Sequence, residues 1–170
     1  MSDLRVRLAR ADEYETLGEL IVDAYVVAEA LDPDGEYQSS LRRVADRAAS
    51  GARVLVAERD GSVVGTACVT PYGTEWSEVA RPDESEFRML AVAPKAMGGG
   101  PGGVAETLVA ACLEQARADG AQTVAISVVD HNTRAHRLYR RLGFTRAPDR
   151  DWTPVPGVRL EVYTLPVGQG

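Results

Sequence analysis

Six residues, Gly98-Gly99-Gly100-Pro101-Gly102-Gly103, decide how the rest of this sequence is interpreted, and they include five of its 16 glycines. A strand-like apolar run, 87–92, comes shortly before them, and an amphipathic run, 104–118, follows directly. Glycine adopts positive φ without steric cost and lets the backbone approach a ligand closely. The first N–H groups of a helix lack partners within the helix and attract anions. The order strand, glycine loop, helix therefore predicts an anion site, most often for phosphate; the alternative is a flexible connector.

The overall composition narrows the class of protein. A chain of 170 residues with 45% apolar and 26% charged residues is typical of a soluble globular protein, and we expect a single domain over 1–170. No apolar run approaches the roughly 20 residues of a membrane span. The first five residues contain no apolar signal-peptide core, so we expect a cytoplasmic protein. A net charge of −6 argues against nucleic acid as a partner.

The cysteines and histidines do not form a metal-binding pattern. Cys68 and Cys112 each lie inside an apolar run and are predicted to be small core residues. His131 and His136 are five residues apart, which does not place them on one helical face. We therefore expect no metal site.

The periodicity of apolar residues predicts about seven strands and four helices. The strands are expected at 4–8, 54–58, 63–70, 86–92, 123–129, 144–146 and 159–165, and the helices at 11–28, 36–49, 104–118 and 133–141. The segments 71–85 and 147–157, which contain most of the prolines, are predicted to be loops. The run 123–129 is almost continuously apolar, as expected for a strand covered on both faces.

Two stretches together carry a family resemblance. The first is Leu90-Ala91-Val92-Ala93-Pro94 with the glycines and the helix that follow it. The second is Asn132-x-x-Ala135-x-x-Leu138-Tyr139-x-x-x-Gly143-Phe144, the more specific of the two. Together they resemble the GNAT superfamily of acetyl-CoA-dependent N-acetyltransferases. The order β-α-α-β-β-β-α-β-α-β predicted above is also that family's order, so the resemblance covers nearly the whole chain.

The resemblance implies a fold and a place for acetyl-CoA. The fold is α/β (α+β): a mixed, mostly antiparallel sheet of about six to seven strands, with about four helices. The sheet is splayed between its fourth and fifth strands, here 86–92 and 123–129. The gap would admit the pantetheine arm of acetyl-CoA as co-substrate, with the backbone of Leu90, Ala91 and Val92 pairing with its amides like an added strand.

The resemblance also implies which residues contact the rest of acetyl-CoA. Asn132 and Ala135 would flank its thiol end, and Tyr139 would point its hydroxyl at the thioester sulfur. The pyrophosphate would be held by the glycine loop and the helix start, that is, by Gly98, Gly99, Gly100, Gly102, Gly103, Val104 and Ala105.

Acyl transfer needs a neutral amine, polarisation of the thioester carbonyl and a proton for the leaving thiolate. A backbone N–H of the splayed strand suits the carbonyl. Tyr139, with a pKa near ~10, can protonate a thiolate whose thiol has a pKa of ~8.5. The alternative for Tyr139 is packing on the core. Glu86 is the candidate base for the amine, directly or through water; the alternative is an exposed acid at the end of a strand.

The glycine loop departs from the family pattern Arg/Gln-x-x-Gly-x-Gly/Ala. The position of the Arg or Gln is taken by Gly100 when the loop is aligned from the helix, and by Met97 when it is counted from Pro94. Pro101 also removes one N–H donor. Phosphate binding would then rest on backbone N–H groups and the helix dipole, with Lys95, Arg134 or Arg137 as substitutes for the missing side chain.

The acceptor is expected to be a small-molecule amine or an amine of a protein or peptide. Its site would be built from the first two helices, the 71–85 loop and the loop that contains Trp152, with Trp76 and Trp152 as a wall or as ordinary packing. The candidates on these two helices and the loop between them are Tyr25, Glu29, Asp34 and Tyr37. The acids Glu75, Asp83 and Glu84 of the 71–85 loop are candidates for attracting a cationic amine. The resemblance also allows a homodimer.

Two other functions remain open at this stage. A GNAT-like module could bind acyl-CoA weakly and serve regulation or interaction without catalysis. A dinucleotide-binding domain is suggested by Gly98-x-Gly100-x-x-Gly103, but five residues, 93–97, separate this motif from its strand. The N-terminal half also lacks the repeated strand–helix units of that fold.

Overall fold

The computed structural model describes residues 3–29, 35–100 and 102–168, so the predictions for Asp34 and Pro101 fall outside them. One eight-stranded sheet has the order β1-β2-β3-β4-β5-β8-β6, and β7 pairs with β8. Neighbouring strands are antiparallel except β4 and β5, which are parallel. The bounds are β1 Leu4–Leu8, β2 Arg53–Arg59, β3 Ser62–Pro71, β4 Glu84–Val92, β5 Thr123–Val129, β6 Thr145–Arg146, β7 Trp152–Val155 and β8 Val158–Pro166. This is the mixed, mostly antiparallel sheet that the resemblance implied.

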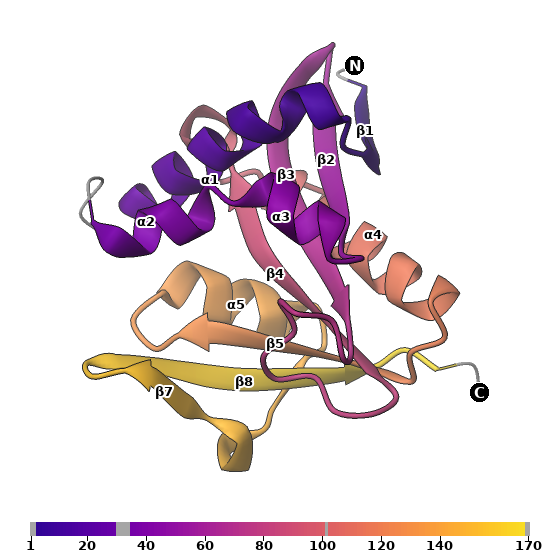
Figure 1. The fold of residues 1–170 in the computed structure, drawn as a ribbon, viewed down its shortest axis with the longest axis vertical. Coiled ribbons are helices and arrows are strands. Elements are labelled where there is room, and N and C mark those ends of the chain that lie inside the picture. The colour runs from indigo at the N-terminus through magenta and orange to yellow at the C-terminus, as the bar shows by residue number, and fades with distance from the viewer. Residues whose placement is uncertain (1–2, 30–34, 101, 169–170) are drawn as a thin grey trace.

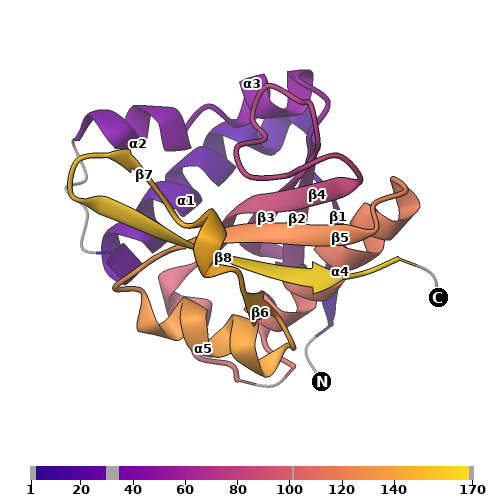
Figure 2. The ribbon, with the colours of Figure 1, turned by 90° about the horizontal axis from the view of Figure 1, so that it is seen from below.

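Five α-helices cover the two faces of this sheet. Their bounds are α1 Tyr14–Glu29, α2 Glu36–Leu41, α3 Val44–Ala49, α4 Val104–Ala118 and α5 Thr133–Arg141, with 3₁₀ turns at Ala11–Glu13, Pro94–Ala96 and Pro148–Arg150. Figure 2, which looks along the layers, shows α1, α2 and α3 on one face and α4 and α5 on the other. The pleat of β2 explains this arrangement: Val54 and Val56 pack into the core under α1, whereas Leu55 and Ala57 pack into the core under α4.

The predicted helix 36–49 is two helices, and this is a correction to the sequence analysis. Arg43 has φ −78° and ψ 51°, which is not helical and separates α2 from α3. The guanidinium of Arg47, only 1% exposed, donates to the carbonyls of Ser40 and Leu41 at 3.0 and 2.7 Å. A buried side chain therefore satisfies carbonyls at the end of α2 that a continuous helix would have satisfied with backbone N–H groups.

The predicted loop 147–157 contains the strand β7, which brings the sheet to eight strands. Asp151, just before β7, is 3% exposed and accepts hydrogen bonds from both terminal nitrogens of Arg146 at 2.8 Å. The Asp151 carboxylate also accepts the backbone N–H of Val162 in β8 at 2.9 Å. The segment is therefore fixed to β8 by a buried carboxylate, which a proline-rich sequence pattern does not reveal.

The sheet opens between β4 and β5. Their ladder contains only three residue pairs, from Glu84 with Thr123 to Glu86 with Ala125, and both strands continue beyond it. Figure 1 shows β4 and β5 diverging from the end at which they pair. A bulge on the other edge of β4 marks the same place, because the register with β3 shifts between Thr66 and Cys68. Met89, opposite this shift, has φ 57°, a strained value for a long side chain.

Candidate active site

A large cavity follows the opening between the two strands. It is a cleft of about 1180 Å³ lined by the diverging halves of β4 and β5, by α1, by the start of α4 and by α5. Every residue that the resemblance assigns to acetyl-CoA lines it except Gly102, and Glu86 lines it as well. Of the three side chains predicted as substitutes for the missing Arg or Gln, Arg134 and Arg137 line the cleft and Lys95 does not. A cleft beside unpaired strand edges offers backbone hydrogen-bonding groups to an extended ligand.

The glycine loop forms one end of the cleft, called here the glycine-loop end. Gly98 and Gly100 have φ of 85° and 56°, and a Cβ on either would meet nothing within 4 Å. Gly99 and Gly103 lie against each other: a Cβ on Gly99 would be 2.9 Å from the Cα of Gly103. A side chain is thus excluded by crowding at Gly99 and Gly103 and disfavoured by the positive φ at Gly98 and Gly100.

An acidic residue occupies the start of α4 at this end. Oε2 of Glu106 accepts the backbone N–H of Gly102 at 3.2 Å and lies 2.6 Å from a guanidinium nitrogen of Arg141 in α5. These two contacts, with Arg141 the stronger, lower the pKa of Glu106, so it is ionised at neutral pH. Together with Arg134 and Arg137, Arg141 lines the cleft.

Tyr139 lines the cleft, and aromatic neighbours hold its ring in place. It is 5% exposed, and its ring centroid lies 5.4 Å from that of Phe144 and 6.0 Å from that of Phe87. None of the described residues forms a hydrogen bond with its hydroxyl. Burial raises the pKa of Tyr139, which keeps the hydroxyl protonated at any physiological pH.

Contacts in its first half hold α5, the helix that carries Tyr139, against the sheet. Asn132 is its N-cap, and the Asn132 side chain accepts the N–H of Ala135 at 3.2 Å. His136 is buried, and its Nε2 donates to the carbonyl of Val129 at 3.1 Å. Nδ1 of His136 then accepts the hydroxyl of Tyr163 at 2.6 Å. These contacts place α5 on β5 and β8 and so determine where Tyr139 projects.

Glu86 is buried and strongly bound. It is 2% exposed, and its Oε1 accepts the hydroxyl of Ser77 at 2.9 Å. The same oxygen accepts the backbone N–H groups of Glu78, Val79 and Ala80 at 2.6, 2.9 and 3.2 Å. An oxygen that accepts four donors has no lone pair left for a proton, so Oε1 anchors the loop between β3 and β4.

The other end of the cleft, called here the tyrosine end, is formed by Tyr25 and Glu29 of α1, Tyr37 of α2, and Glu78 and Arg88. Burial raises the pKa values of Tyr25, Tyr37, Glu29 and Glu78. For Glu29 the nearby His131 acts in the opposite direction, and for Glu78 Arg88 does. Tyr25 interacts electrostatically with Tyr139, so this end adjoins the centre of the cleft.

The tryptophans predicted as walls of an acceptor site do not line the cleft. The Trp76 ring packs against the guanidinium groups of Arg43 and Arg47, at 5.0 and 5.4 Å from its centroid. Trp152 donates its indole N–H to Ser127 Oγ at 3.2 Å, and Ser127 does line the cleft. Both rings support segments near the tyrosine end without contacting its interior. Of the loop acids, Glu84 pairs with Arg150 at 2.7 Å.

Sequence reasoning missed Glu106, Arg141 and Arg88. The spacing of Arg134, Arg137 and Arg141 by three and four places them on one face of α5, and this signal was available. For Arg88, which lies 2.8 Å from Glu78 and donates to the carbonyl of Trp76 at 2.8 Å, no local pattern exists. Its partners come from a loop whose path only the structure gives.

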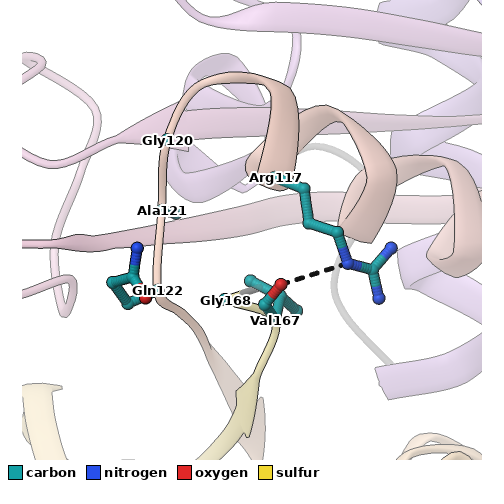
Figure 3. Close-up of a pocket in the computed structure, with 6 residues that line it drawn as sticks. All are labelled: Arg117, Gly120, Ala121, Gln122, Val167 and Gly168. Carbon is teal, nitrogen blue, oxygen red and sulfur yellow. Dashed lines mark hydrogen bonds between the residues drawn. The ribbon is translucent and has the colours of Figure 1, made fainter. Parts of the chain in front are cut away.

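Other features of the described residues carry no comparable chemistry. Cys68 and Cys112 are buried, and burial raises the pKa of the Cys68 thiol to about 11. A search of the described ranges finds no cluster of metal-ligating side chains and no helix long and apolar enough to cross a membrane. A second pocket, of about 270 Å³, lies between residues 117–122 and 167–168. There Arg117 donates to the carbonyl of Val167 at 3.1 Å (Figure 3). That guanidinium is its only charged group.

Comparison with known proteins agrees with this geometry. Residues 14–144 match the model of the acetyltransferase (GNAT) family. The structure of YncA from Salmonella typhimurium, a proposed acetyltransferase with its cofactor acetyl-CoA, is 22% identical, with a TM-score of 0.69 over 98% of this chain and 95% of that one. The ribosomal-protein-alanine N-acetyltransferase of Brucella melitensis is 26% identical, with a TM-score of 0.67 over 95% and 99%.

A third structure, PaiA N-acetyltransferase from Thermoplasma acidophilum in complex with coenzyme A, is 16% identical, with a TM-score of 0.69 over 94% of this chain and 98% of that one. A search of curated proteins found no relative with significant sequence similarity.

Proposed function

This chain belongs to the acetyltransferase (GNAT) family, and from that premise we propose that it transfers the acetyl group of acetyl-CoA to a primary amine by direct attack in a ternary complex. We also propose that residues 1–170 form a single domain with this activity. The observation that carries it is the cleft between β4 and β5, with Tyr139 at its centre.

The residues around the cleft fit acetyl-CoA. Gly99 has no room for a side chain, and Gly98 and Gly100 have a positive φ that favours glycine, which suits close approach of phosphate oxygens to backbone N–H groups. The edges of β4 and β5 beyond their short ladder suit the amide-containing pantetheine arm. When bound, acetyl-CoA supplies the activated acetyl group as a thioester.

In this proposal Tyr139 acts as general acid. Its hydroxyl gives a proton to the sulfur as the bond between the acetyl carbon and sulfur breaks and the bond to the amine nitrogen forms. The Tyr139 hydroxyl is protonated before the reaction, as a general acid must be, and its burial, which raises its pKa, also makes it a weaker acid than an ordinary tyrosine. A backbone N–H of β4 near the Met89 bulge would donate to the carbonyl oxygen as negative charge develops there.

We assign the removal of the amine's proton to Glu29 and an anchoring role to Glu86. Burial raises the pKa of Glu29, which makes its carboxylate a better proton acceptor than an ordinary glutamate. Oε1 of Glu86 already accepts four hydrogen bonds, which leaves only Oε2 for the role expected of Glu86 from the sequence. Glu29 and Glu78 at the tyrosine end, with Glu86 beside it, would also attract an amine that is cationic in water.

A second candidate is an acyl-CoA-binding module without catalysis. Glu106 favours it, because an ionised carboxylate at the start of α4 opposes a phosphate at the same place. The presence of Tyr139 and the tyrosine end favours the enzyme.

A screen of primary amines with acetyl-CoA, read by release of free thiol, tests the proposal. Wild-type protein should release thiol with a subset of amines, and Tyr139→Phe should release far less with the same amines. If no amine stimulates release although coenzyme A binds, the non-catalytic module is the better description.

A further inference from the structure

The arginines of α5 and the carboxylate of Glu106 meet at the glycine-loop end. Arg134, Arg137 and Arg141 share one helical face and all line the cleft. Opposite them, Glu106 is the third residue of α4, and its side chain turns back onto the loop. The only acid that lines the cleft at this end is therefore placed against its basic face.

A single oxygen of Glu106 makes both contacts. Oε2 accepts the N–H of Gly102 and is paired with Arg141, at 3.2 and 2.6 Å. A backbone N–H at a helix start and a guanidinium are the two groups that proteins use most often to bind phosphate oxygens. In this chain an internal carboxylate holds both of them.

We propose that Glu106 is a built-in competitor for the phosphates of coenzyme A, and that Arg141 exchanges the Glu106 carboxylate for a phosphate oxygen when the ligand binds. This inference rests on the proposed function, since it assumes that the cleft binds coenzyme A. It assigns to the Arg141 face of α5 the positive charge that the glycine loop lacks at the position of the family's Arg or Gln.

Exchanging the Glu106 carboxylate for a phosphate oxygen costs little free energy. The side chains of Arg141 and Glu106 are 40% and 30% exposed, and ion pairs that solvated are weak. The phosphates of coenzyme A together carry more charge than one carboxylate, and a phosphate accepts a guanidinium with two parallel hydrogen bonds. Arg137 and Arg134 lie one and two turns away on the same face, so the basic face extends beyond the single contact that Glu106 makes.

A purely structural role for Glu106 predicts something different. As a helix cap, Glu106 would only satisfy the N–H of Gly102 and stabilise α4. Removing its charge would then lower the thermal stability and leave ligand affinity unchanged or weaker. If Glu106 competes with phosphate, removing its charge should instead tighten the binding of a phosphate-containing ligand.

The test is calorimetric titration of the full-length chain with coenzyme A and with pantetheine, which lacks the phosphates. Glu106→Gln, which keeps an amide oxygen for Gly102, should bind coenzyme A more tightly by several-fold, and Arg141→Gln should bind it on the order of tenfold more weakly, the size of one charge-assisted contact. Pantetheine affinity should change in neither variant. Arg140→Gln and Glu114→Gln, on the same two helices but outside the cleft lining, are the matched controls.

The outcomes separate the two proposals. If wild-type protein binds neither ligand at millimolar concentration, the proposed function fails. If it binds coenzyme A but Glu106→Gln leaves the affinity unchanged or weaker, the cleft stands and the competitor is excluded. Equal losses in Arg141→Gln and Arg140→Gln would show only general electrostatic attraction and would also exclude the exchange.

Discussion

The glycine-loop end of the cleft carries three arginines and one glutamate, whereas the tyrosine end, with Glu86 beside it, carries three glutamates and one arginine. Arg134, Arg137 and Glu78 are exposed, while Glu29 is partly buried and Glu86 is fully buried. A ligand with phosphates at one end and an amine that approaches from the other matches this distribution. One cleft thus provides two electrostatic environments, which in the proposed reaction would orient acetyl-CoA and the amine.

The two ends also differ in what holds them. The glycine-loop end is built from a loop, a helix start and α5, with ion pairs near the surface. The tyrosine end is assembled from distant segments, and buried charged groups hold the segments around it: Glu86 for the loop at 77–80, Arg47 for α2, and Asp151 for β7. Changes at the first end should therefore alter affinity, and changes at the second should alter turnover and stability.

The largest effect is expected at the centre, where the two ends meet. Tyr139→Phe should lower kcat by about 10²–10⁴-fold, the usual contribution of a general acid. The affinity for coenzyme A should stay within about twofold, because the ring and its aromatic neighbours remain. Steady-state kinetics and calorimetry together check this. Unchanged kcat would remove Tyr139 from the chemistry.

The next largest effect on activity distinguishes Glu29, at the tyrosine end, from Glu86 beside it. Glu29→Gln should lower kcat/KM by about 10²-fold at pH 7 if Glu29 takes the amine's proton, and the loss should diminish at high pH, where the amine is already neutral. Glu86→Gln keeps an oxygen for the donors at 77–80 and should change kcat/KM much less. The opposite ranking would return the base to Glu86.

Thermal stability provides a control for this pair of variants. The pKa of Glu29 is raised in the folded chain, so its buried charge costs stability at neutral pH but not below its ordinary pKa of 4.5. Glu29→Gln should therefore have a higher melting temperature than wild type at pH 7 and an equal one near pH 4. A lower melting temperature at pH 7 would mean that lost activity reflects damage to the fold.

A smaller effect, on folding stability, is expected at Asp151, just before β7. The pKa of Asp151 is lowered from 3.8 to about 2, mainly by its hydrogen bonds with Arg146. A shift of this size corresponds to about 2 kcal/mol of folding stability. This contribution is present above pH 3.8 and is lost as the pH falls toward 2. Asp151→Asn should therefore be less stable than wild type at pH 7, with the difference closing in acid. Denaturant unfolding at several pH values measures it, and a difference independent of pH would contradict the charge assignment.

The smallest effect concerns how α4 reaches the glycine loop. A Cβ on Gly65 of β3 would lie 2.9 Å from side-chain atoms of Leu108 and Val104 and 3.0 Å from the carbonyl oxygen of Ala91. Gly65→Ala should destabilise the chain by about 1 kcal/mol and weaken coenzyme A binding slightly, as the start of α4 moves outward. Gly61→Ala, at a turn with open space but φ 81°, is a comparison for backbone strain without displacement of α4. Equal affinity losses in both would contradict this explanation.

The glycine-loop end could be predicted from the sequence because its parts are local. A strand, a glycine loop and a helix start are consecutive, and the segment 132–144 carries its own spacing. Among the described residues predicted there, all line the cleft in the structure except Gly102 and Lys95. The contact between Glu106 and Arg141 was not predictable, since it joins residues 35 apart whose helices first meet in the fold.

The tyrosine end could be predicted only in outline. Tyr25, Glu29 and Tyr37 were expected from their place on the first two helices, and they do line the cleft. The anchoring of Glu86, the break between α2 and α3, and β7 were not expected. Each depends on a buried polar contact between segments that local periodicity does not connect, as when Arg47 satisfies the carbonyls of Ser40 and Leu41.

Mass spectrometry of the products of one reaction tests the central claim most directly. Protein incubated with acetyl-CoA alone should carry no acetyl group, and addition of a reactive amine should yield one acetylated amine for each thiol released. This result would support direct transfer to an amine in the cleft. Acetylated protein that passes its acetyl group to the amine, or thiol release without an acetylated amine, would contradict the account.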